Sequence, residues 1–396
     1  MFTYVDQEKS AQVKVIGVGG AGGNAINNMI ASNLQGVKFI AANTDSQALE
    51  ISRAPVKIQM GEKLTEGLGA GANPQIGRDA ALESEEALRN ALADSHMVFI
   101  TAGFGGGTGT GAAPVIAEIC KDMGALTVAV VTKPFAFEGK KRTKLADDGI
   151  ENLKRVVDTA ITIPNDRLRG LAPKNAKLME MFLKADEILL HSVKGITDLI
   201  MMPGLVNLDF ADVKTTMSKA GMAIMGIGIA SGENRAVEAA EQAMSHPLLE
   251  DIPIAGAKSV LMNITSTSDM EFEEVAEASE RIHNEVGDDA DIFWGTSIDD
   301  SLGDEMRVTV LATGIGAEEQ QTEIAGNAVE LTLRGKVRDI TPADLEREIV
   351  DYEEPTFIRQ QKAVGESNGA VYRGHHALPA EDSELDVPTF LRRKAD

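Results

Sequence analysis

The sequence predicts an α/β protein, in which a parallel sheet covered by helices is followed by a long central helix and a second, smaller α/β domain. Two observations carry this prediction. Short apolar runs rich in β-branched residues alternate with helix-length segments between Val13 and Pro164. Residues Asn175 to Met202 then repeat apolar side chains at helical spacing, and Pro203-Gly204 ends that pattern.

The first half contains five expected strands, and helices are expected at Asn24–Ser32 and Ala112–Met123. The strand segments read VKVIGV, VKFIAAN, MVFITAG, LTVAVVT and AITI. In the second half, from Leu205 to Gly316, helical segments again alternate with strands. Those strands read AIMGIGIASG, SVLMNIT, ADIFWGTSI and MRVTVLATGIG. After Gly316 the chain becomes rich in Glu, Gln, Ala and Gly, which predicts a disordered acidic tail.

Composition narrows the possible functions. The formal net charge is −23, which opposes binding to nucleic acids or acidic lipid surfaces. No stretch reaches the roughly 18 apolar residues of a membrane span, and the N-terminus lacks the pattern of a signal peptide. The single cysteine, Cys120, lies on the apolar side of a helical pattern and is expected to fill the core. We therefore expect a cytoplasmic protein without direct membrane insertion.

The first glycine-rich loop, Gly17 to Gly23, follows the first strand and fits the G-x-G-x-x-G pattern. Asp45 ends the second strand, where a ribose-binding acid of a dinucleotide fold would lie. One interpretation of this loop is therefore NAD binding. The other is that its glycines only permit a tight turn between strand and helix.

The second glycine-rich loop, Gly103 to Gly111, follows the third strand segment and leads into a helix. Its glycines expose a row of backbone N–H groups, and a helix N-terminus adds partial positive charge. Thr108 and Thr110 can donate hydroxyl hydrogen bonds to phosphate oxygens. No Walker lysine follows, so the loop is not a common P-loop. Two such loops on neighbouring strands indicate a triphosphate site.

Seven motifs, in order, make the chain resemble the FtsZ family of tubulin-like bacterial cell-division GTPases. The motifs are GVGGAGGNA, NTD, GLGAGANP, GGGTGTG, KPFAFEGKKR, IPND and PGLVNLDFADV. The resemblance covers roughly Val13 to Gly316 and resumes at the C-terminus. It implies a tubulin-like fold whose first, Rossmann-type domain binds GTP.

The resemblance implies a role for each glycine-loop residue. The first loop would touch phosphates through Gly20, Ala21, Gly22 and Asn24, and the next motif would approach the γ-phosphate through Ala70, Gly71, Ala72 and Asn73. The α- and β-phosphates would be held by Gly103, Gly105, Gly106, Gly107, Thr108, Gly109, Thr110 and Gly111.

The guanosine would be bound by a second set of residues: Thr132, Pro134, Glu138, Arg142, Asn165 and Phe182. Glu138 and Arg142 match family positions at the ribose and base, Asn165 one at the guanine edge, and Phe182 would stack on the ring. The usual Asn-Asp pair of the central helix is Asp186-Glu187 here. Register favours Glu187 as the guanine acceptor, with Asp186 as the alternative.

The loop from Asn207 to Asp212 matches the family's synergy loop, which reaches the nucleotide of the next subunit. The resemblance implies that its catalytic residues are Asn207, Asp209 and Asp212. Asp209 and Asp212 form an i, i+3 pair at a helix start, which places both carboxylates on one face, where they can orient a water molecule. Without the resemblance, Asp209 would be interpreted as an N-cap and Asp212 as a first-turn acid. A protein that binds GTP and forms filaments without hydrolysis is a further alternative.

The resemblance also implies cofactors, assembly and location. GTP or GDP would bind with Mg²⁺ held mainly through the nucleotide, with no dedicated protein metal ligands and with a monovalent cation as a further candidate. Copies would polymerise head to tail and form the division ring at mid-cell. The implied parts are a flexible segment at 1–12, a GTP-binding domain at 13–174, the central helix at 175–203, a GTPase-activating domain at 204–316, a disordered linker at 317–384 and a docking peptide at 385–396.

The C-terminal peptide resembles the one through which the family binds membrane-anchoring and regulatory division proteins. Its contact residues would be Val387, Pro388, Phe390, Leu391 and Arg392. A related sequence, Pro355 to Arg359, lies within the linker. It is either a second, weaker docking site or a chance copy.

Overall fold

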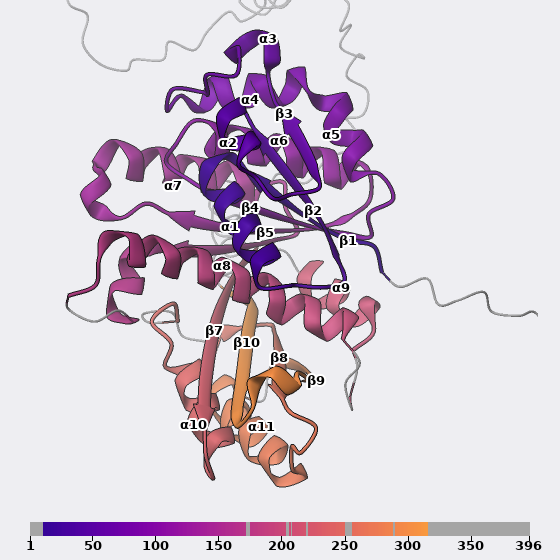
Figure 1. Cartoon of the computed structure of the whole chain (residues 1–396). Helices are drawn as coiled ribbons and strands as arrows, with labels where there is room; N and C mark the ends of the chain where they lie inside the picture. The colour runs from indigo at the N-terminus through magenta and orange to yellow at the C-terminus, as the bar shows by residue number, and fades with distance from the viewer. Residues whose placement is uncertain are drawn as a thin grey trace, which may run out of the picture. The chain divides into compact units, whose positions relative to one another are not determined.

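A single ten-stranded sheet organises the computed structural model, in the order β3-β2-β1-β4-β5-β6-β7-β10-β8-β9 (Figure 1). Strands β1 to β6 pair in parallel, β7 joins β6 in parallel, and β10 lies antiparallel between β7 and β8. The structure describes residues 11–171, 175–202, 206, 208–218, 221–249, 256–287 and 290–315. The predicted α/β class is confirmed, whereas Asn207 and the predicted linker and docking peptides lie outside the described residues.

The first half supplies six strands and most of the helices. Its strands are β1 (Val13–Val18), β2 (Val37–Asn43), β3 (Val56–Gln59), β4 (Met97–Gly103), β5 (Leu126–Lys133) and β6 (Thr159–Pro164). Its helices are α1 (Gly19–Ala31), α2 (Ser46–Glu50), α3 (Glu62–Thr65), α4 (Pro74–Glu83), α5 (Glu85–Leu92), α6 (Thr108–Asp122), α7 (Lys140–Lys154) and the 3₁₀ segments η1 (Ala136–Glu138) and η2 (Asn165–Leu171).

The long helix α8 (Leu178–Met201) leads into the second half. The second half consists of α9 (Phe210–Ser218), β7 (Gly221–Ser231), α10 (Arg235–Met244), β8 (Ser259–Ser266), α11 (Phe272–Val286), β9 (Asp291–Ile298), η4 (Asp300–Leu302) and β10 (Glu305–Ile315). In the part of the chain that the structure describes, no helix is both long and apolar enough to cross a bilayer.

Two helices begin earlier than their residue types predict. α1 begins at Gly19 and α6 at Thr108, so part of each glycine-rich loop forms the first helical turn. Glycine disfavours helix on propensity alone. Here tertiary packing overrides propensity, because glycine at these positions lets helix and strand backbones approach closely. A Cβ on Gly109, for example, would lie 2.5 Å from the carbonyl oxygen of Gly103.

Side-chain alternation assigns the two faces of the sheet. Phe99 points to a core with α1 and α8, whereas its neighbours Val98 and Ile100 point to a second core with α4, α5, α6 and α7. A third core lies under α10 and α11 in the second half. Helices therefore cover both faces of the parallel strands.

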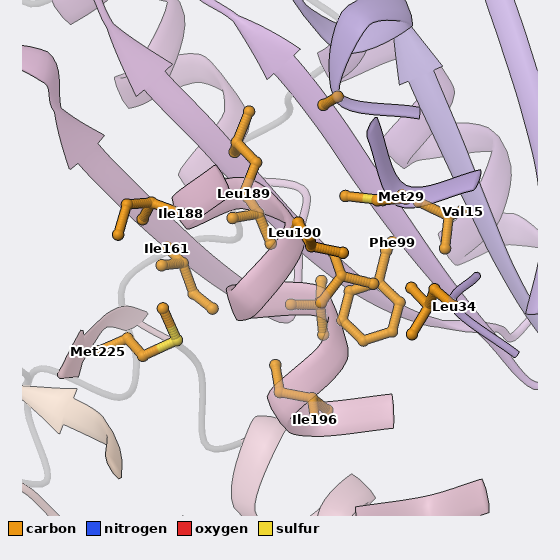
Figure 2. Close-up of a cluster of buried hydrophobic side chains, with 14 of the residues drawn as sticks. Val15, Met29, Leu34, Phe99, Ile161, Ile188, Leu189, Leu190, Ile196 and Met225 are labelled. Atoms are coloured by element: carbon orange, nitrogen blue, oxygen red, sulfur yellow. The ribbon is translucent and has the colours of Figure 1, made fainter. Parts of the chain in front are cut away.

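Helix α8 joins the two halves through the first of these cores. Figure 2 shows Ile188, Leu189 and Leu190 of α8 among side chains from several strands, including Ile161 of β6 and Met225 of β7. These α8 residues are at most 6% exposed. Because one helix buries apolar side chains against strands of both halves, it fixes their relative placement.

Close packing between β7 and α10 yields the first prediction. A Cβ on Gly228 would overlap the carbonyl oxygen of Ala239 in α10. Gly228→Ala should therefore lower the free energy of unfolding by about 3 kcal/mol through overpacking. Urea unfolding would measure this. Gly23→Ala is the matched control, since a Cβ there meets nothing within 4 Å; it should stabilise helix α1 slightly. Equal stability of both variants would contradict the packing.

Candidate active site

A cavity of about 430 Å³ lies at the carboxyl ends of the parallel strands, where ligands bind in α/β folds. Its walls come from the segments that follow β1, β4, β5 and β6 and from the start of α8. The lining residues are Gly20, Ala21, Asn24, Gly103, Phe104, Gly106, Gly107, Thr108, Gly109, Thr132, Pro134, Glu138, Arg142, Asn165, Phe182, Ala185 and Asp186. Most of the residues expected from the sequence at a nucleotide thus meet in one place.

Two helix N-termini converge on this cavity. The first turns of α1 and α6 contribute Gly20 and Thr108 to its wall, and neither turn contains an acidic residue. A Cβ on Gly20 or Gly106 would meet no atom within 4 Å. Their backbone is therefore open to a ligand, and the unpaired N–H groups and helix dipoles favour an anion such as phosphate.

Other glycines of the two loops have packing roles. A Cβ on Gly22 would overlap the carbonyl oxygen of Thr101, and one on Gly111 would overlap that of Pro74. Gly105 has a φ of 95°, and its N–H donates to Thr110 Oγ1 at 2.9 Å. None of Gly22, Gly105, Thr110 and Gly111 lines the cavity. These residues shape the loops that carry the exposed backbone groups.

The segment Ala70 to Asn73 lies against the second glycine loop. A Cβ on Gly107 would lie 2.8 Å from both Ala70 Cβ and Asn73 N. Gly71 and Ala72 have left-handed backbones, with φ of 56° and 57°, and Asn73 caps helix α4 by accepting from the Gln75 N–H at 3.0 Å. The segment borders the second glycine loop without lining the cavity.

Aromatic and charged groups form the other end of the cavity. Phe182 is 42% exposed and meets the buried ring of Phe135 edge to face, with centroids 5.5 Å apart. Its free face can stack on a base. Glu138 forms a 2.6 Å ion pair with Arg142 and also accepts from the Phe135 N–H. These bonds hold Arg142 at the cavity rim.

Two acceptors in the cavity lack partners within the described structure. Asn165 is 5% exposed, and its Oδ1 makes no hydrogen bond. Burial raises the pKa of Asp186 from 3.8 to about 6, because no cation or donor offsets the desolvation of its carboxylate. A ligand edge with N–H donors, such as the Watson–Crick edge of guanine, would satisfy both groups.

The geometry reverses the preference between the adjacent acids of α8. Glu187 does not line the cavity and instead forms a 2.7 Å ion pair with Lys184. Asp186 lines the cavity. Successive residues of a helix differ by about 100° in direction, so a shift of one position in register changes which side chain faces the ligand.

Asp209 and Asp212 lie at the opposite edge of the sheet. The Phe210 ring contacts His96, just before β4, with centroids 6.3 Å apart. At the other end of α9, the Met217 carbonyl accepts from the hydroxyl of Thr159, the first residue of β6. The length of β4, at about 3.3 Å per residue, separates this edge from the cavity by roughly 20 Å. The two carboxylates therefore cannot reach this cavity.

In the part of the chain that the structure describes, the carboxylates of Asp209 and Asp212 accept no hydrogen bond from the first turn of α9. The Asp212 N–H donates to the main-chain carbonyl of Asp209 at 3.0 Å, not to its side chain. Within the described residues, neither carboxylate has a hydrogen-bond or ion-pair partner. Asp209 is exposed and Asp212 half-buried.

Asp45, the acid expected to bind the ribose of NAD, already accepts hydrogen bonds from the main chain. Asp45 Oδ1 accepts from the N–H groups of Gln47 and Ala48, which makes it the N-cap of α2. It does not line the cavity. The geometry thus offers no support for the dinucleotide interpretation of the first loop.

A larger groove of about 500 Å³ runs between α4, α6 and α7. Only Thr110 and Gly111 among the expected site residues line it. Its rim is formed by exposed side chains, including Arg78 and Arg155. Size alone does not identify the site, and we assign the chemistry to the cavity at the strand ends.

Comparisons with known proteins agree with this geometry. The model of the Tubulin/FtsZ family GTPase domain matches residues 12–173, and that of the FtsZ family C-terminal domain matches residues 221–316. The chain belongs to the FtsZ family. The family resemblance found in the sequence is confirmed. This FtsZ-family chain therefore carries a GTPase domain, and GTP or GDP binding and GTP hydrolysis are the chemistry of that domain.

Sequence similarity to known FtsZ proteins extends over the whole length, or nearly the whole length, of this FtsZ-family chain. The cell division protein FtsZ of Pseudomonas aeruginosa is 48% identical over 402 residues, covering 100% of both chains. That of Coxiella burnetii is 49% identical over 388 residues, covering 97% of each. A solved FtsZ dimer from M. jannaschii is 47% identical with a TM-score of 0.76, covering 78% of this chain and 90% of that one.

Sequence reasoning did not single out every residue of the site. Phe104 and Ala185 line the cavity, and Phe135 supports Phe182 from beneath. Thr44, also not singled out, bonds to Thr108. A signal existed for Thr44, since it is the middle residue of the NTD motif, but nothing in the motif says which loop its side chain faces.

The raised pKa of Asp186 predicts a pH-dependent stability of the nucleotide-free protein. Between about pH 4 and pH 6, the folded state keeps a proton on Asp186 that the unfolded state loses. Stability contributed by this residue therefore falls as pH rises through that window. Asp186→Asn should be more stable than wild type by about 2 kcal/mol at pH 7 and equal to it at pH 4. Urea unfolding at the two pH values tests this; a difference independent of pH would contradict it.

Proposed function

We propose that this chain is a GTPase whose active site is complete only between two copies stacked head to tail. The observation that supports this proposal is the separation described above. The cavity lies at one edge of the sheet, while the carboxylates of Asp209 and Asp212, which have no partner among the described residues, lie at the other edge. One copy would supply the nucleotide and the next the acids.

In this proposal, the glycine loops hold the phosphates. The backbone at Gly20 and Gly106 and the two helix N-termini bind the α- and β-phosphates, and the segment from Ala70 to Asn73 approaches the γ-phosphate. Phe182 stacks on the guanine. Asp186 accepts from its N1–H and amino groups, and Asn165 adds a second acceptor. Adenine presents no N1–H, so Asp186 gives selectivity for guanine.

Hydrolysis would use groups of the neighbouring copy. Asp209 and Asp212, three positions apart at the start of α9, orient the attacking water and polarise it as general bases, with Asn207 beside them. Mg²⁺, bound mainly through the nucleotide, would neutralise the phosphate charge that develops. Among the described residues, no group of three or more His, Cys, Asp or Glu side chains is placed to hold a metal ion. A monovalent cation is a further candidate ligand of this site.

An apolar surface beside the cavity supports the contact between copies. Phe137, Leu178, Met179 and Leu183 are between 55% and 75% exposed, next to Phe182. Large side chains exposed together in this way are typical of interaction surfaces. The solved relative from M. jannaschii is an FtsZ dimer. Two different edges in contact make a heterologous interface, which repeats into a filament.

The family membership also supports a cellular role. We propose that filaments form in the cytoplasm at mid-cell, in the division ring. The peptide with Val387, Phe390 and Leu391 would dock on membrane-anchoring and regulatory division proteins, and the copy from Pro355 to Arg359 would add a weaker second site.

Mixing two inactive variants tests the shared active site. Asp212→Ala should bind GTP normally and hydrolyse it at least about 100-fold more slowly. Gly106→Ala places a methyl group in the cavity without touching other atoms; it should fold normally and bind GTP more than about tenfold more weakly. Phosphate release should return when the two are mixed, because intact acids of one then meet GTP on the other.

Hydrolysis within a single copy would leave that mixture inactive. Gly23→Ala serves as the control for Gly106→Ala, since its added methyl also meets no neighbour but lies outside the cavity. It should bind and hydrolyse GTP at wild-type rates. Addition of NAD in place of GTP should drive neither assembly nor turnover.

Matched substitutions can measure separately how much the C-terminal peptide and the copy from Pro355 to Arg359 contribute to partner binding. Phe390→Ala should weaken binding of the full chain to an immobilised anchoring partner by roughly tenfold or more, because it removes the central apolar anchor. Phe357→Ala should cause a smaller loss, visible mainly with a multivalent partner surface. Surface plasmon resonance at low and high partner density measures both. Unchanged avidity in Phe357→Ala would remove the second site from the proposal.

A further inference from the structure

A pair of threonines, of which Thr44 is buried and Thr108 half-buried, lies at the end of the cavity that the glycine loops form. Thr44 follows β2 and is fully buried, with 0% exposure. Its Oγ1 lies 2.7 Å from Oγ1 of Thr108, the first residue of α6. Thr108 also lines the cavity. The pair thus connects the end of one strand to the helix N-terminus that faces the phosphates.

The backbone of Thr44 is fixed by the next loop. Its carbonyl oxygen accepts from the Gly69 N–H and from the Thr65 hydroxyl, each at 3.2 Å. Asp45 and Leu68 form a β-bridge beside these bonds. Gly69 immediately precedes the segment from Ala70 to Asn73. With its main chain tied in this way, Thr44 holds its hydroxyl at a constant position against Thr108.

The number of hydroxyl protons available decides which of the two threonines donates the hydrogen bond. Each hydroxyl has a single proton to donate. Thr44 is sealed from solvent, and Thr108 is its one hydroxyl partner among the described residues. An ionised phosphate only accepts. When a bound phosphate accepts from Thr108, the Thr108 proton points to the phosphate, and the hydrogen bond between the threonines then has the Thr44 hydroxyl as donor and Thr108 Oγ1 as acceptor.

We propose that Thr44 is a positioning residue of the phosphate site. By donating to Thr108, its hydroxyl orients the Thr108 side chain and leaves the Thr108 proton directed into the cavity, where it bonds to a phosphate oxygen. The chain of donors also polarises the Thr108 hydroxyl and makes it a better donor. This inference rests on the proposed placement of the nucleotide in the cavity.

A double-mutant cycle on the full chain tests the inference. Thr44→Val keeps the shape of the side chain and removes the hydroxyl; it should raise the dissociation constants of both GTP and GDP about fivefold. Thr108→Val should raise them about tenfold or more. Because Thr44 acts through Thr108, the double variant should bind no more weakly than Thr108→Val alone. Fluorescent nucleotide titration below the concentration for assembly measures all four proteins.

Two further variants separate positioning from a general structural effect. Thr44→Ser keeps the hydroxyl and should bind nucleotide at wild-type affinity, whereas a packing role would require the lost methyl. Thr127→Val also removes a buried, hydrogen-bonded strand hydroxyl, but at the other end of the sheet. It should lower the melting temperature without changing nucleotide affinity.

The outcomes distinguish this inference from the proposed function. Wild-type affinity of Thr44→Val, or additive losses in the double variant, would overturn the positioning role while Gly106→Ala still impairs binding. If Gly106→Ala binds GTP as tightly as wild type, the nucleotide does not occupy the cavity. Both proposals then fail together.

Discussion

The close approach of backbones at glycine positions is the constraint on which the site depends. Gly22 brings α1 against β4, Gly109 brings α6 against the end of β4, and Gly111 brings α6 against α4. Side chains at these positions would push the helices outward. Only with the helices seated this closely do two N-termini share one cavity and direct their partial positive charges, each roughly half a unit, at the same anion.

A second requirement of the fold is a constant distance between the edge of the sheet that carries the cavity and the edge that carries Asp209 and Asp212. Helix α8 buries Ile188, Leu189 and Leu190 in the same core as strands of both halves. It also carries Phe182 and Asp186 at its first turns, beside the cavity. In the proposed head-to-tail contact, a helix that lines the cavity and also ties the halves together would hold the cavity of one copy and the α9 acids of the next in a fixed geometry.

Sequence reasoning succeeded where residue type alone specifies the geometry. Runs of glycine after apolar strands pointed to the two loops that contribute to the cavity, and family motifs pointed to Glu138, Arg142 and Asn165, all of which line it. It was less successful where tertiary packing decides. The choice between Asp186 and Glu187 depends on the rotation of α8 about its axis. The early starts of α1 and α6 depend on close backbone contacts. The short edge strand β3 was missed because it has no strong apolar pattern. The partnership of Thr44 with Thr108 joins residues 64 positions apart, and no local pattern reveals it.

In the head-to-tail filament proposed above, the placement of the cavity and the acids at opposite edges would give the filament two chemically different ends. At one end, the last cavity is uncovered and can exchange its nucleotide, but no acids reach it. At the other end, the last pair of acids has nothing to act on. Hydrolysis is then confined to internal contacts, so a newly added subunit keeps its triphosphate until another subunit covers it. Contacts that formed earlier would therefore hold GDP more often than contacts that formed recently. Subunits could then be added at one end of the filament and lost from the other.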